Sequence, residues 1–174
     1  MNMRTFLDKG ELLGVSIGMN RENVIGLLGA PVQWVGQPPT IGKAIVSYED
    51  SPVFLYAKSA VGIHFNRQGI ANALTVNFDR LKTPQETKLF SDGCNFETVG
   101  NLIQWLNARN IPFTKARDDE DPKWMLIREC AVVTSIPFED GYPIQFGDQH
   151  LYSITVTDGH QHAMQLVRTG RYFE

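Results

Sequence analysis

The clearest hydrophobic pattern in the chain is helical and lies between residues 18 and 31. Val24, Leu27 and Leu28 occupy positions i, i+3 and i+4 and would form one apolar face. Asn20 is suited to cap the first turn, since its side-chain oxygen can accept from free backbone N–H groups. Gly29 and Pro31 are typical of a helix end. The pattern therefore predicts a short helix with Leu27 and Leu28 buried.

The residues after this helix read as strands separated by turn residues. In the first half the predicted strands are 44–49, 53–57, 61–66 and 70–78, and a hairpin turn joins the last two. A second helix is expected to begin at Asn95 as N-cap, to bury Leu102 and Ile103, and to end near Asn107. Four more strands are predicted at 124–129, 131–138, 143–146 and 151–157. Residues 161–169 fit either a last strand or a short helix.

The two halves share residues in the same order. The series Asn20, Glu22, Val24 and Leu27 recurs 75 positions later, and the run 73–76 recurs 80 positions later as 153–156. Such self-similarity predicts a duplication. We expect a first α+β unit at 1–78, a linker at 79–93 and a second unit with a C-terminal tail at 94–174. The predicted fold is α+β, with the helices packed on one face of a joined sheet of about eight antiparallel strands and the other face open.

Residues 15–31, which read VSIGMNRENVIGLLGAP, carry a resemblance to known proteins. They resemble the opening motif of the SmpA/OmlA family of small outer-membrane assembly lipoproteins. The same motif opens the β-lactamase inhibitory proteins, which contain two tandem helix-plus-sheet units, and the tandem pattern here is more similar to these. The resemblance implies that fold and a tendency to bind proteins. It does not imply that a β-lactamase is the target.

Composition narrows the possible functions. The net charge is −3 and the pI is about 5.8, so the basic footprint of a nucleic-acid-binding protein is not expected. Cys94 and Cys130 are too few for a disulfide-dependent secreted domain. With no run that matches a leader peptide or a membrane span, we expect a cytoplasmic, bacterial protein without membrane contact.

Few residues suggest chemistry. His160 and His162 could supply two zinc ligands, but a third ligand is not near in sequence, so a solvated turn is favoured. Phosphate-loop, nucleophile-elbow and paired-cysteine motifs do not occur in the sequence. We therefore expect a protein that is not an enzyme, with no catalytic residue, no metal and no cofactor.

The favoured hypothesis is a non-enzymatic protein-binding module, such as a cytoplasmic inhibitor or toxin-immunity protein. It would act by steric occlusion through the open sheet face, on another protein such as a basic toxin or enzyme. The alternative is a small-molecule-binding or enzymatic domain that uses the cleft between the two units. Polar and aromatic side chains placed opposite the apolar core positions are the candidate partner-binding residues. They are His64, Asn66, Arg128, Gln145, Tyr152 and Trp34.

Overall fold

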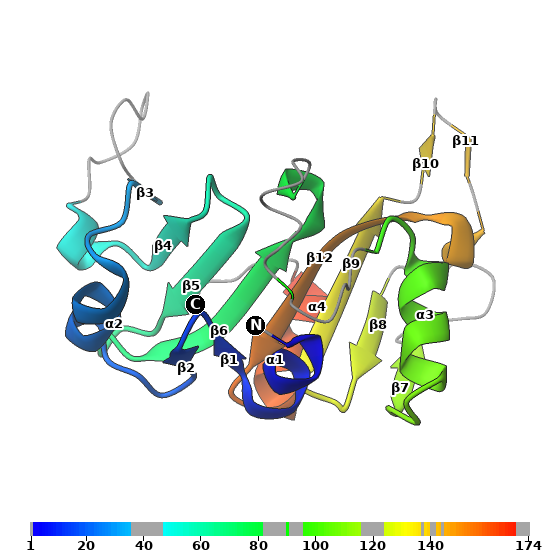
Figure 1. The fold of residues 1–174 in the computed structure, drawn as a ribbon, viewed down its shortest axis with the longest axis horizontal. Helices are drawn as coiled ribbons and strands as arrows, with labels where there is room; N and C mark the ends of the chain where they lie inside the picture. Colours follow the sequence, from blue (N-terminus) through cyan, green and yellow to red (C-terminus); the bar gives the residue numbers. More distant parts are fainter. Residues whose placement is uncertain are drawn as a thin grey trace.

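An eight-stranded antiparallel sheet dominates the computed structural model of the 174-residue chain (Figure 1). The strand order is β3-β4-β5-β6-β12-β9-β8-β7. The structure describes residues 2–35, 47–81, 90, 96–115, 124–136, 138–139, 142–143 and 145–169. The predicted α+β class and large antiparallel sheet are therefore confirmed.

The chain fills this sheet from both edges toward the middle. The first four strands in chain order are β3 (Gln33–Trp34), β4 (Val53–Tyr56), β5 (Val61–Phe65) and β6 (Ala71–Asn77). The other four are β7 (Phe113–Lys115), β8 (Trp124–Ile127), β9 (Ala131–Ile136) and β12 (His150–Thr157). Two small hairpins lie outside it, β1 (Glu11–Leu12) with β2 (Val15–Ser16) and β10 (Phe138–Glu139) with β11 (Tyr142–Pro143).

The two sets of strands meet where β6 pairs with β12. In this register Thr75 lies opposite Thr155, and their hydroxyl oxygens are 2.8 Å apart. The Nε2 atom of His64 in β5 lies 2.8 Å from the same Thr75 hydroxyl. A row of polar side chains thus crosses the middle of one sheet face, with its hydrogen bonds made between strands.

The opposite face holds the main core. Helices α1 (Met3–Lys9), α2 (Arg21–Leu28) and α3 (Val99–Asn107) lie against it (Figure 1). Helix α1 was not predicted, although Met3, Phe6 and Leu7 follow a helical spacing and are at most 1% exposed. Its end requires Gly10, which has φ 57° and whose added Cβ would come 2.6 Å from Ile17.

Helix α4 (His160–Thr169) lies on the other side of the sheet. Its Ala163 and Leu166 are buried against Leu126 of β8 and Val132 of β9. The ambiguous segment 161–169 is therefore helical. The expectation that all helices pack on one face was wrong, because Leu126 and Val132 give that face an apolar strip that a helix can cover.

Several local predictions also need correction. Leu27 is 52% exposed and Leu28 is half-buried, whereas Leu102 is buried as predicted and Ile103 is half-buried. Asn95 lies outside the described residues, and the side chain that caps α3 is that of Thr98, which forms a capping box with Asn101.

Two predicted strands differ from the structure in the residues that it describes. Residues 44–46 lie outside the described residues, and the end of that strand is the 3₁₀ turn η1 (Tyr48–Asp50). The predicted strand 143–146 includes the end of β11 and the start of the 3₁₀ turn η4 (Phe146–Asp148). The predicted linker 79–93 begins within the 3₁₀ turn η2 (Phe78–Arg80), and most of it lies outside the described residues.

Candidate binding surfaces

His64, a predicted partner-binding residue, is on the same sheet face as α4 but is only 6% exposed. Its Nε2 atom is held by the Thr75 hydroxyl at 2.8 Å. Burial, with a smaller contribution from the charge of nearby His162, lowers the pKa of His64 from 6.5 to about 3. The imidazole is therefore neutral at physiological pH and belongs to the interior polar row.

The remaining predicted partner-binding residues have separate local surroundings. The side-chain oxygen of Asn66 accepts from the N–H groups of Gln68 and Ile70, at 3.0 and 3.1 Å, and so closes the β5–β6 turn. Trp34 is half-buried with its ring centroid 6.0 Å from that of Tyr48. Gln145 is exposed at the start of η4, and Tyr152 is 39% exposed on β12.

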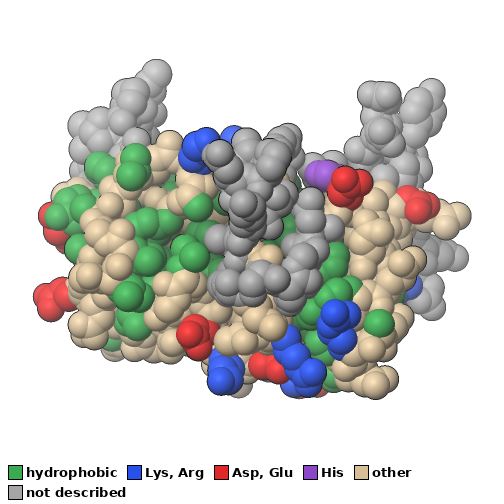
Figure 2. Space-filling view, viewed as in Figure 1, with side chains coloured by type: hydrophobic (Ala, Val, Ile, Leu, Met, Phe, Trp, Pro, Cys, Tyr) green, Lys and Arg blue, Asp and Glu red, His purple; other side chains and the backbone are tan. Residues whose placement is uncertain are grey.

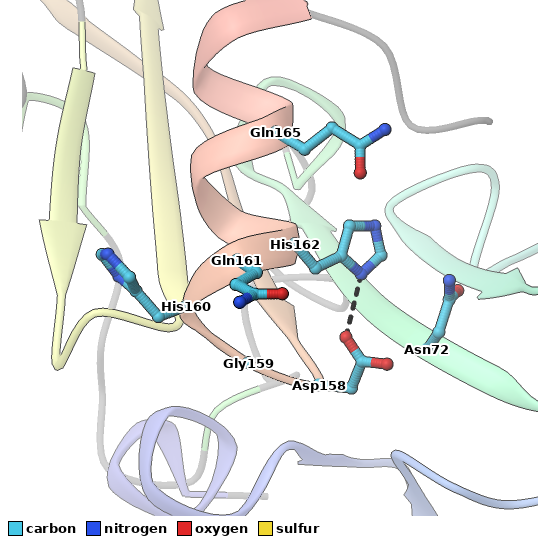
Figure 3. Close-up of a pocket in the computed structure, with 7 residues that line it drawn as sticks. All are labelled: Asn72, Asp158, Gly159, His160, Gln161, His162 and Gln165. Atoms are coloured by element: carbon cyan, nitrogen blue, oxygen red, sulfur yellow. Dashed lines mark hydrogen bonds and ion pairs between the residues drawn. The ribbon is translucent and has the colours of Figure 1, made fainter.

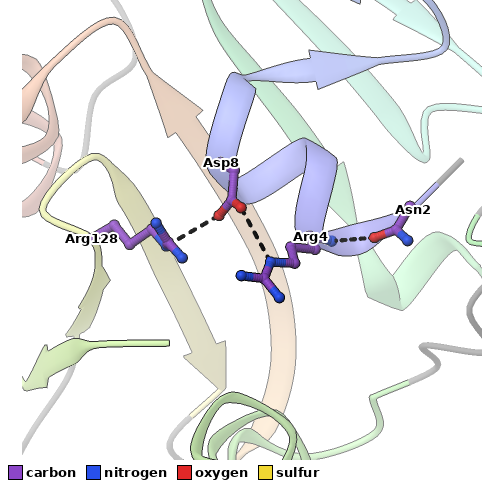
Figure 4. A network of polar contacts seen from close by, with 4 residues as sticks. All are labelled: Asn2, Arg4, Asp8 and Arg128. Carbon is purple, nitrogen blue, oxygen red and sulfur yellow. Dashed lines mark hydrogen bonds and ion pairs between the residues drawn. The ribbon is translucent and has the colours of Figure 1, made fainter. Parts of the chain in front are cut away.

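Arg128 is exposed in the β8–β9 turn and faces helix α1 (Figure 4). Its Nε lies 3.1 Å from Asp8 Oδ1, and Arg4 Nε lies 3.3 Å from Asp8 Oδ2. This contact explains the position of Arg128 as an attachment of α1 to the second half of the sheet. The structure thus shows local contacts for His64, Asn66, Trp34 and Arg128, and it places the six predicted residues on different elements.

A polar cavity lies beside the first turns of α4 (Figure 3). Its volume is about 540 Å³, and it is lined by Asn72, Asp158, Gly159, His160, Gln161, His162 and Gln165. His162 Nδ1 is 3.0 Å from Asp158 Oδ1. The sequence points to His160 and His162 as a pair, but His160 Nδ1 instead lies 3.1 Å from the backbone oxygen of Glu129. The two imidazoles are therefore directed to different partners.

The walls of the polar cavity are fixed by backbone contacts. The Asp158 N–H donates to the Asn72 carbonyl at 3.0 Å, which joins the end of β12 to the start of β6. The Thr157 hydroxyl donates to the Gly159 carbonyl at 2.9 Å. In the described part of the chain, no three His, Cys, Asp or Glu side chains are grouped so that they could hold a metal ion. Asn72 and Gln165 were not found by sequence reasoning, because amide side chains carry no motif signal.

A second surface lies where α2 ends and β3 begins. Leu27, Val32 and Val35, here termed the apolar corner, are 52%, 84% and 42% exposed. Figure 2 shows hydrophobic side chains gathered on the side of the molecule that carries α2 and β3. Three of the four large hydrophobic side chains that are exposed in the described part of the chain thus fall within residues 27–35. Exposed apolar surface of this kind is typical of an interaction site.

The apolar corner rests on a well-bonded frame. The Tyr56 hydroxyl donates to the Gly29 carbonyl at 3.0 Å, and the Ser51 hydroxyl donates to the Val35 carbonyl at 2.9 Å. Both contacts tie the segment after α2 to the β4 region. The exposure of Val32 and Val35 is thus imposed by a backbone that is held on both sides.

Acidic side chains lie near the apolar corner. Arg21 at the start of α2 donates from Nη2 to the Ser51 carbonyl at 2.9 Å, which brings α2 beside η1. Its guanidinium carbon lies 4.8 Å from the Phe65 ring centroid, and burial lowers the pKa of Arg21 while the charge of Asp50 opposes this effect. Exposed Glu22, Glu49 and Asp50 therefore form an acidic side to this surface.

Cys130 does not fit the role of a nucleophile. The thiol is half-buried, and burial raises its pKa, which lowers the fraction of reactive thiolate. Cys94 lies outside the described residues.

Comparisons with protein-family models, with curated proteins and with solved structures give no match. Among the helices of the described ranges, none has the length and apolar character needed to cross a membrane. The function is therefore inferred from the surfaces themselves.

Proposed function

We propose that the protein is a non-enzymatic protein-binding module that inhibits its partner by steric occlusion, as a toxin-immunity protein would. The observation that carries the proposal is the apolar corner, whose three side chains are exposed on a segment that is hydrogen-bonded to the β4 region. Leu27 would stabilise the fold if it were buried, and its exposure gives up that stability. A role in binding a partner accounts for an exposed leucine at this position.

The surroundings of the apolar corner suit a protein interface. Half-buried Trp34, Tyr48 and Tyr56 pack against the core beside it and add aromatic area. The nearby Glu22, Glu49 and Asp50 would favour a partner with basic residues around an apolar centre, since complementary charge steers encounter and excludes wrong partners. This arrangement agrees with the hypothesis of a basic toxin or enzyme as the partner, acting in the cytoplasm.

The proposal includes a duplicated architecture, in which residues 1–78 and 94–174 are two units joined at β6 and β12. Two observations support it. The N-cap residues Asn20 of α2 and Thr98 of α3 each form an isolated β-bridge, to Ile70 and to His150 respectively. Thr75 pairs with Thr155, which lies 80 positions later. In this alignment α3 is matched to α2 from Thr98, and β10–β11 is an insertion of the second unit.

The test is a pull-down from the native host with matched variants. The change Leu27→Asp with Val32→Asp should abolish retention of the partner that the wild type captures, because a charge would be buried in the interface. Tyr152→Ala is the control, since Tyr152 is 39% exposed on β12, away from the apolar corner. Loss of the partner with Tyr152→Ala but not with the corner variant would move the interface to the sheet face first predicted. Retention by both variants would exclude both surfaces.

A further inference from the structure

The polar cavity carries an inference that goes beyond the proposed function. It is shaped by α4, by the end of β12 and by the start of β6, and its backbone frame is fixed by the Asp158–Asn72 hydrogen bond. It is a widely open depression, and its volume of about 540 Å³ is enough for a small ligand. Figure 3 shows the Asp158, His162, Gln165 and Asn72 side chains grouped along one side of α4.

The chemistry of these side chains limits the ligand. Of the described lining residues, Asp158 is the acidic one, and it disfavours an anion. Its Oδ1 lies 3.0 Å from His162 Nδ1, which leaves Oδ2 for a ligand. A metal ion is disfavoured because no three His, Cys, Asp or Glu side chains in the described part of the chain are grouped so that they could hold one. An apolar ligand is disfavoured, because it would displace water from the amide, carboxylate and imidazole groups of the cavity without offering them hydrogen bonds.

The same groups suit a ligand with several hydroxyls. An amide such as that of Asn72 or Gln165 carries both donor and acceptor atoms, and a carboxylate oxygen can accept more than one hydrogen bond, so Asp158 can bind a hydroxyl while it contacts His162. The Oδ1 atom of Asn72 is buried and makes no hydrogen bond within the described part of the chain. If the Asn72 amide rotated toward a ligand, its oxygen would gain a hydrogen-bond partner. A ligand hydroxyl suits this amide, because it can donate to the oxygen or accept from the nitrogen.

We propose that the polar cavity binds a small neutral polyol of about monosaccharide size. Adjacent hydroxyls of the ligand donate to the Asp158 carboxylate, and the Asn72 and Gln165 amides bind the next hydroxyls. His162 is a positioning residue that holds Asp158 through the 3.0 Å contact. The cavity is separate from the apolar corner in the residues that form it.

The test uses the full chain with D-glucose and myo-inositol as probes, followed by amide and imidazole NMR signals and by calorimetry. We expect saturable shifts at Asn72, Asp158 and Gln165 with a Kd of about 1 mM, as suits a few hydrogen bonds to a small ligand. Asp158→Asn should weaken binding about tenfold, because hydrogen bonds to a charged acceptor are the stronger ones. Gln165→Ala should weaken it less.

Gln145→Ala is the matched control, since Gln145 is an exposed amide outside the polar cavity, and it should leave the Kd unchanged. Acetate and ethylammonium are the charged probes. Binding of either charged probe at least as tightly as the polyols, or no shift of the cavity signals with either polyol, would overturn the proposal. Equal affinity of Asp158→Asn, Gln165→Ala and wild type would also overturn it. The corner variant Leu27→Asp with Val32→Asp should bind polyols normally, so failure of one proposal is distinguishable from failure of the other.

Discussion

Helices α2 and α3 lie on the same face of one sheet, yet they use their apolar residues differently. In α3, Val99, Leu102 and Leu106 are all fully buried. In α2, Val24 is fully buried, but Leu27 is 52% exposed. The sequence patterns of the two helices are alike, so the difference reflects how much surrounding structure covers each helix. An apolar residue left uncovered on α2 is more informative about function than a covered one on α3.

The difference begins where each helix ends. Helix α2 ends at Gly29, and the following segment passes through exposed Val32 into the edge strand β3. After α3 the chain instead buries Ile111, whose N–H donates to the Leu106 carbonyl at 3.0 Å. The segment after α3 thus packs against the end of that helix, whereas the segment after α2 is exposed at Val32.

The largest expected effect separates the two helices directly. Leu102→Ala should destabilise the protein by about 2–5 kcal/mol, because it leaves a cavity in a filled core. Leu27→Ala should change the free energy of unfolding by less than about 0.5 kcal/mol, as exposed positions do. Urea unfolding of both variants measures this. Equal losses would mean that Leu27 is covered in solution, and they would contradict the proposal that the apolar corner binds a partner.

A second prediction compares the two halves of the α4-side sheet face. The second half buries Val132 beneath α4, whereas the first half buries the imidazole of His64, with His162 as the neighbouring titratable group. Since the pKa of His64 falls from 6.5 to about 3 on folding, the unfolded chain binds the proton more readily in that range. Protonation of the unfolded chain at His64 therefore leaves the stability of the fold unaffected above pH 6.5 and lowers it as the pH falls from 6.5 toward 3.

His64→Gln removes this titration and keeps a side chain able to reach the Thr75 hydroxyl. We expect the free energy of unfolding of this variant to fall less steeply than that of the wild type between pH 6 and 4, measured by urea unfolding at each pH. Other groups titrate equally in both proteins, so the difference between the two slopes isolates His64. Identical slopes would show that His64 is hydrated in solution.

The N-cap residues of α2 and α3 should contribute similar amounts to stability. The Asn20 side chain accepts from the Asn23 N–H at 2.8 Å, and the Thr98 hydroxyl accepts from the Asn101 N–H at 3.3 Å. Asn20→Ala and Thr98→Ala should each cost about 1 kcal/mol, since each leaves a helix donor without its partner. Thermal unfolding of both variants measures it. A negligible cost for Thr98→Ala would contradict the alignment of α3 with α2 at this residue.

Features of the fold that depend on neighbouring residues can be predicted from the sequence. Asn20, Gly29 and Pro31 act on their own neighbours, so helix α2 is predictable from them. The strands of the sheet are similarly marked by turns. Burial is not local, and the i, i+3 pattern therefore placed Leu27 in the core although its side chain is 52% exposed. The exposed face of α2 had to be read from the structure.

Similar letters also misled the alignment of the halves. Phe146 is the same residue type 81 positions after Phe65, close to the spacing of the repeats, yet Phe65 is in strand β5 and Phe146 is in the 3₁₀ turn η4. The pairing of Thr75 with Thr155 supports the proposed duplication more directly, because it is a contact between strands and not a likeness of residue types. The polar cavity was beyond prediction for the same reason, since it brings Asn72 beside Asp158 through a contact between β6 and the end of β12.

The smallest expected effect concerns the attachment of α1 to the second half of the sheet. Arg128 Nε and Asp8 Oδ1 are 3.1 Å apart, and their side chains are 34% and 28% exposed. An ion pair in this partly solvated setting contributes less than about 1 kcal/mol. Helix α1 is instead held by Met3, Phe6 and Leu7, which are buried in the main core. The ion pair therefore sets the orientation of α1 more than its stability.

A double-mutant cycle with Asp8→Ala and Arg128→Ala measures the coupling energy between the two side chains. Arg128 has a φ of 49°, and the backbone strain there cancels because it affects both arms of the cycle equally. We expect a coupling of about 0.5 kcal/mol that declines as the ionic strength is raised toward 1 M, because salt screens exposed charges. A coupling above about 2 kcal/mol that resists salt would instead identify a desolvated pair. In that case the attachment of α1 to the second half of the sheet would depend on charge as well as on the burial of its apolar side chains.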